Sequence, residues 1–222
     1  MSGAPPTAGR LAGVVLAGGL ARRMGGGDKP LLTIDGRPML ARILGRLRPQ
    51  VTALAINANG DPARFAAFSV PVIADAIAGH AGPLAGVLAG LRWAGGAVPG
   101  AEALITVAGD TPFFPLDLAA RFAEAERRAG GQVIALAACE GNVHPVFGLW
   151  PLGLADALEA FLTEGEERKI LAFTDRHRRI SVTFPRYRSG PAGIDPFFNV
   201  NTPDDVVEGE AIAAALAESG IA

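Results

Sequence analysis

Cysteine, tyrosine and long apolar segments are scarce in this chain of 222 residues. The single cysteine, Cys139, cannot form an internal disulfide, which is compatible with a reducing compartment. No apolar run approaches the roughly 20 residues of a membrane span. Residues 1–9 lack the basic start and the apolar block of a signal peptide. We therefore expect a cytoplasmic protein with no membrane partner.

A strong charge of either sign is also missing. The formal net charge is −2 and aromatic residues make up 6% of the chain. The sequence therefore has no global basic field and no interleaved basic and aromatic stripe, which argues against binding of nucleic acid. Hydrophobic residues at 50%, beside 19% charged residues, indicate a folded globular chain instead.

Strand-like and helix-like segments alternate along the chain. Strands are predicted at 13–17, 51–56, 70–74, 103–108, 132–138, 143–150 and about 179–184, and helices at about 38–47, 84–94, 117–128, 151–163 and 166–175, with a short helix opened by Asp61-Pro62 and a last one after Thr202-Pro203. This alternation predicts parallel βαβ units in an α/β fold. The short gap before 143–150 predicts a hairpin that adds an antiparallel strand. We expect one domain over residues 1–222, with 1–10 as a flexible extension and 186–197 as a loop.

Residues 14–29, VVLAGGLARRMGGGDK, are the most informative segment. An apolar strand runs into Gly18 and Gly19, which permit positive φ and let backbone N–H groups approach a ligand closely. A concavity of such groups binds anions, and Arg22 and Arg23 add positive charge beside it. We interpret the segment as a loop for the polyphosphate of a nucleotide. A surface loop with solvated arginines is the structural alternative.

Lys29 closes this loop, but in neither of two known phosphate motifs. A Walker loop needs a lysine between glycine and serine or threonine, whereas Lys29 lies between Asp28 and Pro30. Pro30 also stands where the last glycine of the dinucleotide fingerprint belongs. The loop therefore indicates phosphate binding of some other kind.

Three further strands are followed by polar residues where they end, at Asn57, Asp75 and Asp110. Ligands bind at the carboxyl ends of strands in open α/β sheets. Asp110 follows an apolar run and precedes Thr111-Pro112, so its carboxylate is well placed for Mg²⁺. The alternatives are that Asp110 caps the following turn, that Asp75 bridges a loop, and that Asn57 only makes a turn.

Two asparagines late in the chain alternate in the segment Asn199-Val200-Asn201. The next residues form a helix start, with Thr202 as N-cap and Pro203 at the first helical position. Capping explains these two residues but not the asparagines, which would project to the same side of a strand. The asparagines are therefore further candidates for the site.

Together these motifs resemble those of the molybdenum cofactor guanylyltransferases. The segments LAGGLARRMGGGDK, INAN, VIADA, GPLAG, GDTPF, HPVFGLW and FFNVNTPDD occur one after another in the order of that family, over about residues 13–205. The resemblance implies a Rossmann-like three-layer αβα sandwich with a mostly parallel sheet, of the nucleotide-diphospho-sugar transferase type. It also implies transfer of GMP from Mg²⁺-bound GTP to molybdopterin, which releases pyrophosphate and forms the guanine dinucleotide cofactor.

The resemblance implies roles for individual residues and partners as well. It suggests nucleotide contacts at Leu16, Ala17, Gly18, Lys29, Asn57, Asp75 and Asp110, catalytic roles for Lys29, Arg23 and Asp110, Asp110 as the Mg²⁺ ligand, and Asn199 and Asn201 near the second substrate or the metal. The expected partners are GTP, molybdopterin, proteins that deliver molybdopterin and proteins that mature molybdoenzymes.

Other functions remain open at this point. Phosphates are alike on every nucleotide, so a molybdopterin cytidylyltransferase or a sugar-phosphate or polyol-phosphate nucleotidylyltransferase would use the same loop. A non-catalytic nucleotide-binding protein on this fold would be expected to lose Lys29 or Asp110, and this chain has both. Residues 185–197 receive no role from the resemblance.

Overall fold

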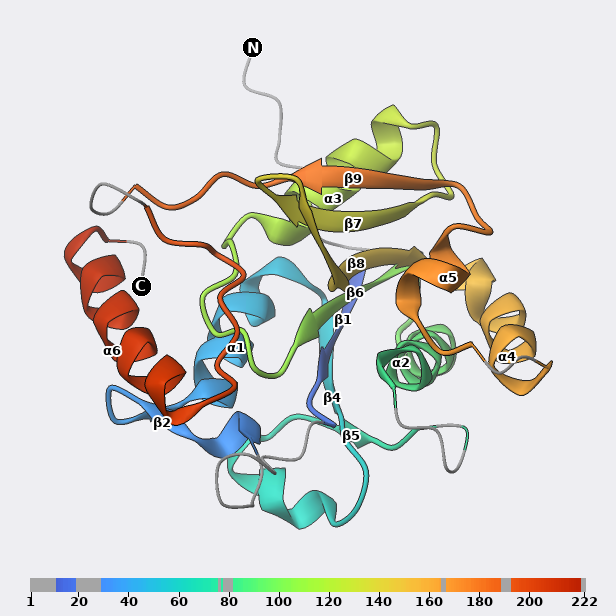
Figure 1. The fold of residues 1–222 in the computed structure, drawn as a ribbon. Coiled ribbons are helices and arrows are strands. Elements are labelled where there is room, and N and C mark those ends of the chain that lie inside the picture. The colour runs from blue at the N-terminus through green and yellow to red at the C-terminus, as the bar shows by residue number, and fades with distance from the viewer. Residues whose placement is uncertain are drawn as a thin grey trace.

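The computed structural model describes residues 11–18, 29–75, 77, 82–164, 167–188 and 193–220. A seven-stranded sheet forms the centre, with strand order β5-β4-β1-β6-β8-β7-β9 (Figure 1). Its strands are β1 (Leu11–Leu16), β4 (Ala53–Asn57), β5 (Val72–Ile73), β6 (Ala103–Ala108), β7 (Ile134–Cys139), β8 (Asn142–Pro151) and β9 (Arg179–Thr183). Within this sheet β8 is antiparallel to β6 and β7, and the other neighbours are parallel. The predicted mostly parallel α/β fold and the hairpin are confirmed.

Helices cover both faces of the sheet and make three layers (Figure 1). One face carries α1 (Met39–Leu47) and α3 (Leu118–Arg128), and the other carries α2 (Pro83–Ala97), α4 (Ala155–Glu164) and α5 (Ile170–Thr174). The last helix, α6 (Pro203–Glu218), packs outside this arrangement against a short hairpin, β2 (Thr33–Ile34) and β3 (Arg37–Pro38).

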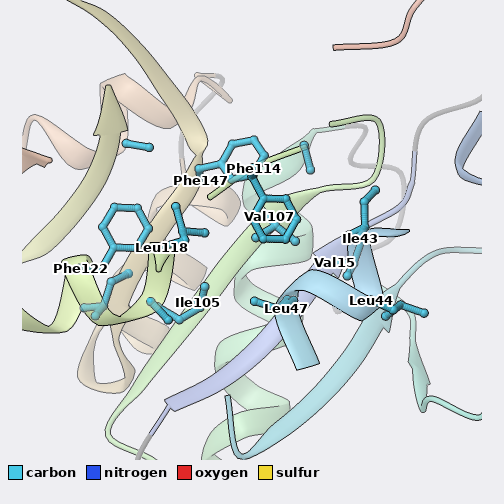
Figure 2. Close-up of a cluster of buried hydrophobic side chains, with 14 of the residues drawn as sticks. Val15, Ile43, Leu44, Leu47, Ile105, Val107, Phe114, Leu118, Phe122 and Phe147 are labelled. Atoms are coloured by element: carbon cyan, nitrogen blue, oxygen red, sulfur yellow. The ribbon is translucent and has the colours of Figure 1, made fainter. Parts of the chain in front are cut away.

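The central strands are apolar on both sides because both of their faces are covered. Val15 of β1 and Val107 of β6 pack toward Ile43 of α1 in the cluster that Figure 2 shows. Val14 of β1 and Leu104 of β6 point to the opposite face of the sheet, where they pack in a second apolar cluster with residues of α2. All of these side chains are fully buried. At about 1.5–3 kcal/mol for each large apolar side chain, their burial makes β1 and β6 a rigid base for the residues at their carboxyl ends.

The carboxyl ends of β1 and β6 lie side by side. From β1 the chain passes to β4 and β5 on one side, and then returns to β6 on the other side, which makes this a topological switch point. The backbone N–H of Gly109 donates to the carbonyl of Leu16 over 2.9 Å. A Cβ at position 109 would lie 2.9 Å from that oxygen and 3.0 Å from Cα of Ala17, so the close approach requires glycine.

Most predicted elements lie within a few residues of their observed bounds. The strand predicted at 103–108 coincides with β6, and the hairpin turns through Glu140 and Gly141, both at positive φ. Both predicted N-caps are confirmed, since the side chain of Asp61 accepts from the N–H of Ala63 and that of Thr202 from the N–H of Asp205.

Two predicted elements are shorter than expected. The strand at 70–74 is reduced to Val72–Ile73, because the preceding proline offers no N–H to the ladder. The helix predicted at 166–175 begins only at Ile170. There the side chain of Glu167 accepts from the backbone N–H groups of the next two residues, and Lys169 stays extended with ψ 136°.

The β2–β3 hairpin was not predicted. Its turn residues Asp35 and Gly36 have φ of 50° and 66°, as a two-residue hairpin turn requires. The Asp-Gly pair was the signal that could have found it. Among the described residues no helix combines the length and the apolar character needed to cross a lipid bilayer. The single domain over residues 1–222 stays a prediction, and residues 1–10 lie outside the described part of the chain.

Candidate functional site

A cavity of about 1060 Å³ opens at the carboxyl ends of the strands. This volume is at the upper end of the range that small-molecule sites occupy. Its lining includes the ends of β1, β4, β5 and β6, the start of α2, and one side of β8: Leu16, Ala17, Gly18, Lys29, Pro30, Asn57, Asn59, Asp75, Ile77, Gly82, Pro83, Ala108, Gly109, Asp110, Val143, His144, Pro145, Val146, Phe147 and Asn199. The cavity therefore spans the sheet from its β5 edge to β8.

Lys29 and Asp110 meet in this cavity. The Lys29 Nζ lies 2.6 Å from Asp110 Oδ2, although 81 residues separate them in sequence. Lys29 is the first residue of a short 3₁₀ helix, Lys29–Leu31, and 9% of its surface is exposed. Asp110 directly follows β6. The same ammonium also donates to Oδ1 of Asn201. Two oxygens thus converge on one positive charge.

The segment that carries the two asparagines is attached directly to the end of β6. The backbone N–H of Val200 donates to the carbonyl of Asp110 over 2.9 Å. The hydroxyl of Thr111 donates to Oδ1 of Asn199 and lies 3.1 Å from Asp110 Oδ1. The structure therefore brings Asn199 and Asn201 together with Asp110, although the segment is not a strand. Thr111 received no role in the sequence analysis beyond ending the strand.

Asp205, at the start of α6, holds the same segment from its other end. Its carboxylate accepts from the backbone N–H of Asn201 over 2.7 Å and from that of Thr202 over 2.8 Å. These two hydrogen bonds, with a smaller contribution from the nearby Lys29, hold the pKa of Asp205 below its ordinary value. Sequence reasoning missed Asp205, and the signal was an acidic residue three positions after the capping Thr202.

Asn57 and Asp75 lie together at the β4–β5 end of the cavity. The Asn57 carboxamide donates to Asp75 Oδ1 over 2.9 Å and to the carbonyl of Ile73 over 3.2 Å. Asn59, two residues after Asn57, donates to Asp75 Oδ2 over 2.7 Å and accepts from the N–H of Asp75 over 2.9 Å. Both carboxylate oxygens of Asp75 are thus engaged by asparagines. This end of the cavity is a polar wall with a defined arrangement.

Helix α2 lies very close to this wall. A Cβ at Gly86 would lie 2.2 Å from Oδ1 of Asn57 and 2.9 Å from Cδ2 of Leu16. Asn57 is buried, with 4% of its surface exposed. Gly86 therefore allows Asn57 to occupy its place.

The β8 side of the cavity is mostly apolar and carries one histidine. The ring of His144 stacks on that of Phe197, with centroids 4.5 Å apart and planes 24° apart. Burial lowers the pKa of His144, so its imidazole is neutral at pH 7. The sequence analysis assigned no role to this residue.

Leu16, Ala17 and Gly18, for which the resemblance implies nucleotide contacts, line the cavity. The contacts themselves stay a prediction. The remaining loop residues, 19–28, lie outside the described residues, and with them Arg22 and Arg23. The predicted positions of these two arginines stay predictions.

The donor set around Lys29 fits a small divalent cation. The described residues contain no group of three or more His, Cys, Asp or Glu side chains that could hold a metal. The Lys29 ammonium nevertheless stands in for a cation between a carboxylate oxygen and a carboxamide oxygen. Mg²⁺ is commonly held by one or two carboxylates together with substrate phosphates, so one carboxylate is sufficient here.

Open α/β sheets bind ligands at such a switch point, and comparison with known proteins shows which class of protein this site belongs to. The family described as the MobA-like NTP transferase domain matches residues 13–180. The molybdenum cofactor guanylyltransferase of Mesorhizobium japonicum is 50% identical, over 94% of this chain and 97% of its own length. That of Rhodopseudomonas palustris is 52% identical, over 90% and 92%.

A solved structure has the same fold. The crystal structure of molybdopterin-guanine dinucleotide biosynthesis protein A from Archaeoglobus fulgidus aligns with a TM-score of 0.68 at 23% identity, over 91% of this chain and 98% of that one. The chain belongs to the MobA-like NTP transferase family and, within it, to the molybdenum cofactor guanylyltransferases. The predicted resemblance is confirmed.

Proposed function

We propose that this enzyme transfers GMP from Mg²⁺-bound GTP to molybdopterin and releases pyrophosphate. The observation that carries the proposal is the Lys29–Asp110 pair, with 2.6 Å between Nζ and Oδ2, at the junction of β1 and β6 inside the cavity. The names of relatives at about 50% identity support the choice of substrates.

The polar groups along the cavity suggest where each part of GTP would bind. Asn57 and Asp75 would face the guanosine, and the backbone of Leu16, Ala17 and Gly18 would approach the phosphates. Lys29 would contact phosphate oxygens, as would Arg23 from the loop outside the described residues. Along the edge of the sheet, the groups proposed for the nucleoside lie at β5 and β4, and those proposed for the phosphates lie at β1 and β6. This order matches the nucleoside and the polyphosphate of one extended nucleotide.

A metal ion would be held by Asp110 and Asn201. When bound, Mg²⁺ neutralises charge that develops on the phosphates of the substrate. The chain's own residues would position the two substrates and neutralise the remaining phosphate charge. Thr111 and Asp205 keep Asn199 and Asn201 beside Asp110, so that the oxygens stay converged.

The reaction is an in-line displacement at phosphorus. A phosphate oxygen of molybdopterin would form a bond to the α-phosphorus of GTP while the bond from that phosphorus to the β-phosphate oxygen breaks. The leaving pyrophosphate takes the bonding electron pair and would be stabilised by Lys29. A phosphate monoester is largely ionised at neutral pH, so no general base is needed.

The β8 side of the cavity would receive the acceptor. Val143 and Val146 offer partly exposed apolar surface on β8, which neighbours β6 in the sheet, whereas Asn57 and Asp75 lie at β4 and β5. A planar heterocycle fits such surface, and its phosphate would reach the centre of the cavity. The proposal also places the reaction in the cytoplasm, with partner proteins that supply molybdopterin and receive the product.

The test is turnover of purified protein with molybdenum-loaded molybdopterin and either GTP or CTP, with product dinucleotides separated by chromatography. We expect guanine dinucleotide and pyrophosphate with GTP, and turnover with CTP lower by at least about 100-fold, the discrimination that a few hydrogen bonds to the base can provide. Preferred use of CTP, or of a sugar phosphate as acceptor, would replace the proposed activity by one of the alternatives.

A further inference from the structure

The two asparagines beside Asp110 have their carboxamide oxygens engaged by different donors. Oδ1 of Asn201 accepts from the Lys29 ammonium, which marks a cation position. Oδ1 of Asn199 instead accepts from the hydroxyl of Thr111, a neutral donor. The two carboxamides therefore face different chemical groups although they belong to one short segment.

The Thr111 hydroxyl determines which way Asn199 points. A hydroxyl has one proton to donate, and Thr111 lies closer to Asn199 Oδ1 than to Asp110 Oδ1 at 3.1 Å. Thr111 is fully buried, so its hydroxyl does not donate to bulk solvent. With Oδ1 held inward, the NH₂ group of Asn199 is directed away from Thr111. Asn199 is exposed and lines the cavity, and no described residue accepts from that NH₂.

We propose that Thr111 is a positioning residue that presents the NH₂ of Asn199 as a hydrogen-bond donor to a phosphate oxygen of a bound substrate. Asn201, in contrast, presents its oxygen to a cation. The inference rests on the proposed function, because it takes the cavity to be a site for two phosphate-bearing substrates. The phosphate belongs either to the nucleotide or to the acceptor, and binding measurements with the nucleotide alone separate the two sources.

The first comparison exchanges each asparagine for a carboxylate. Asn199→Asp replaces a donor by a negative charge facing phosphate, and we expect kcat/KM to fall by at least about 100-fold, the scale for loss of one preorganised donor. Asn201→Asp retains an oxygen at the cation position, and we expect a loss below about tenfold, the effect of one altered hydrogen bond. Equal losses, or a larger loss in Asn201→Asp, would contradict the opposite orientations of the two carboxamides.

The second comparison removes the hydroxyl of Thr111. Thr111→Val is close in shape but has no donor, and Thr111→Ser retains one. We expect Thr111→Val to raise the KM of either GTP or molybdopterin by about tenfold, the effect of losing one hydrogen bond to a charged partner. Thr111→Ser should restore that KM. A purely structural role for Thr111 would lower the melting temperature and leave both KM values unchanged, and that result would overturn the proposal.

Calorimetric titration of each variant with Mg²⁺-bound GTP alone identifies the phosphate. Weaker GTP binding in Thr111→Val and Asn199→Asp assigns it to the nucleotide. Unchanged GTP binding with a raised KM for molybdopterin assigns it to the acceptor. If wild-type protein forms no guanine dinucleotide, the proposed function fails. If it does and both comparisons show no difference, only the present inference fails.

Discussion

In the proposed function, charge neutralisation in the cavity depends most on Lys29. Its ammonium contacts both Asp110 and Asn201, and its residue is only 9% exposed, which strengthens its electrostatic interactions. We expect Lys29→Ala to lower kcat/KM by at least about 100-fold, since it removes a preorganised charge from the phosphates. Steady-state kinetics with GTP and molybdopterin measure this.

The chain has one other lysine, Lys169, which is exposed before α5 and does not line the cavity. Lys169→Ala is therefore the matched control and should retain the activity of the wild type. Near-normal turnover of Lys29→Ala would reject the role of Lys29, whatever the control shows.

Asp110 is expected to control the metal dependence of the reaction. Asp110→Asn removes the carboxylate charge but keeps an oxygen and the shape of the side chain, so the fold should be retained. We expect the Mg²⁺ concentration for half-maximal activity to rise, because one amide oxygen binds a hard cation less well than a carboxylate. The control is Asp117→Asn, at a carboxylate that pairs with Arg121 outside the cavity. A magnesium titration identical to that of the wild type would show that Asp110 is not the ligand.

At the scale of elements, α2 determines the β4–β5 wall of the cavity through Gly86. A methyl group there would lie 2.2 Å from Asn57 Oδ1 and 2.9 Å from Cδ2 of Leu16, so the Asn57 carboxamide would have to shift. We expect Gly86→Ala to raise KM for GTP, because Asn57 must leave its bond to Asp75. Gly95→Ala, in the same helix with open space around its Cβ, should instead raise the free energy of unfolding by about 0.5–1 kcal/mol. Unchanged KM in Gly86→Ala would mean that the wall does not contact the nucleotide.

The start of α6 connects helix capping to the site, and this connection depends on pH. Asp205 has a lowered pKa in the folded protein because the N–H groups of Asn201 and Thr202 donate to its carboxylate. A group with a lowered folded pKa contributes stability above its unfolded pKa and loses it as pH falls through the folded value.

We therefore expect Asp205→Asn to lower the free energy of unfolding relative to the wild type at pH 7, and this difference to shrink below about pH 4, where the carboxylate becomes protonated. Urea unfolding at pH 7 and at pH 3 measures both. Thr202→Ala, which removes the partner cap, should cost about 1 kcal/mol. A difference between Asp205→Asn and the wild type that is independent of pH would mean that the charge of Asp205 has no part in capping.

Elements were predictable from sequence where the pattern is local. The apolar runs of β1 and β6 and the turn of the β7–β8 hairpin are determined by neighbouring residues, so periodicity and glycine located them. The ends of α5 and β5 depend on side-chain contacts and on a proline, which periodicity does not register. The β2–β3 hairpin is too short for a pattern, and only its Asp35-Gly36 turn signals it.

At the scale of the whole molecule, the sequence predicted that polar residues lie at the strand ends, but it did not predict which of them contact one another. Asn57, Asp75 and Asp110 come after strands, and the rule for parallel sheets brings them to one edge. The approach of Asn199 and Asn201 depends on a segment that returns from β9 across the end of β6, and no local pattern encodes that path. The role of Thr111 was missed for the same reason, whereas Asp205 had a local signal, its position three residues after the capping Thr202.

The central claim is that the loop after β1 and the carboxylate after β6 hold one metal-bound triphosphate. The most direct measurement is a crystal structure of the protein with Mg²⁺ and a GTP analogue whose bridge between the α- and β-phosphates is a methylene group. We predict phosphate oxygens within hydrogen-bond distance of Lys29 Nζ, a metal ion on Asp110, and guanosine beside Asn57 and Asp75. A triphosphate bound elsewhere, with Lys29 still paired to Asp110, would contradict the account.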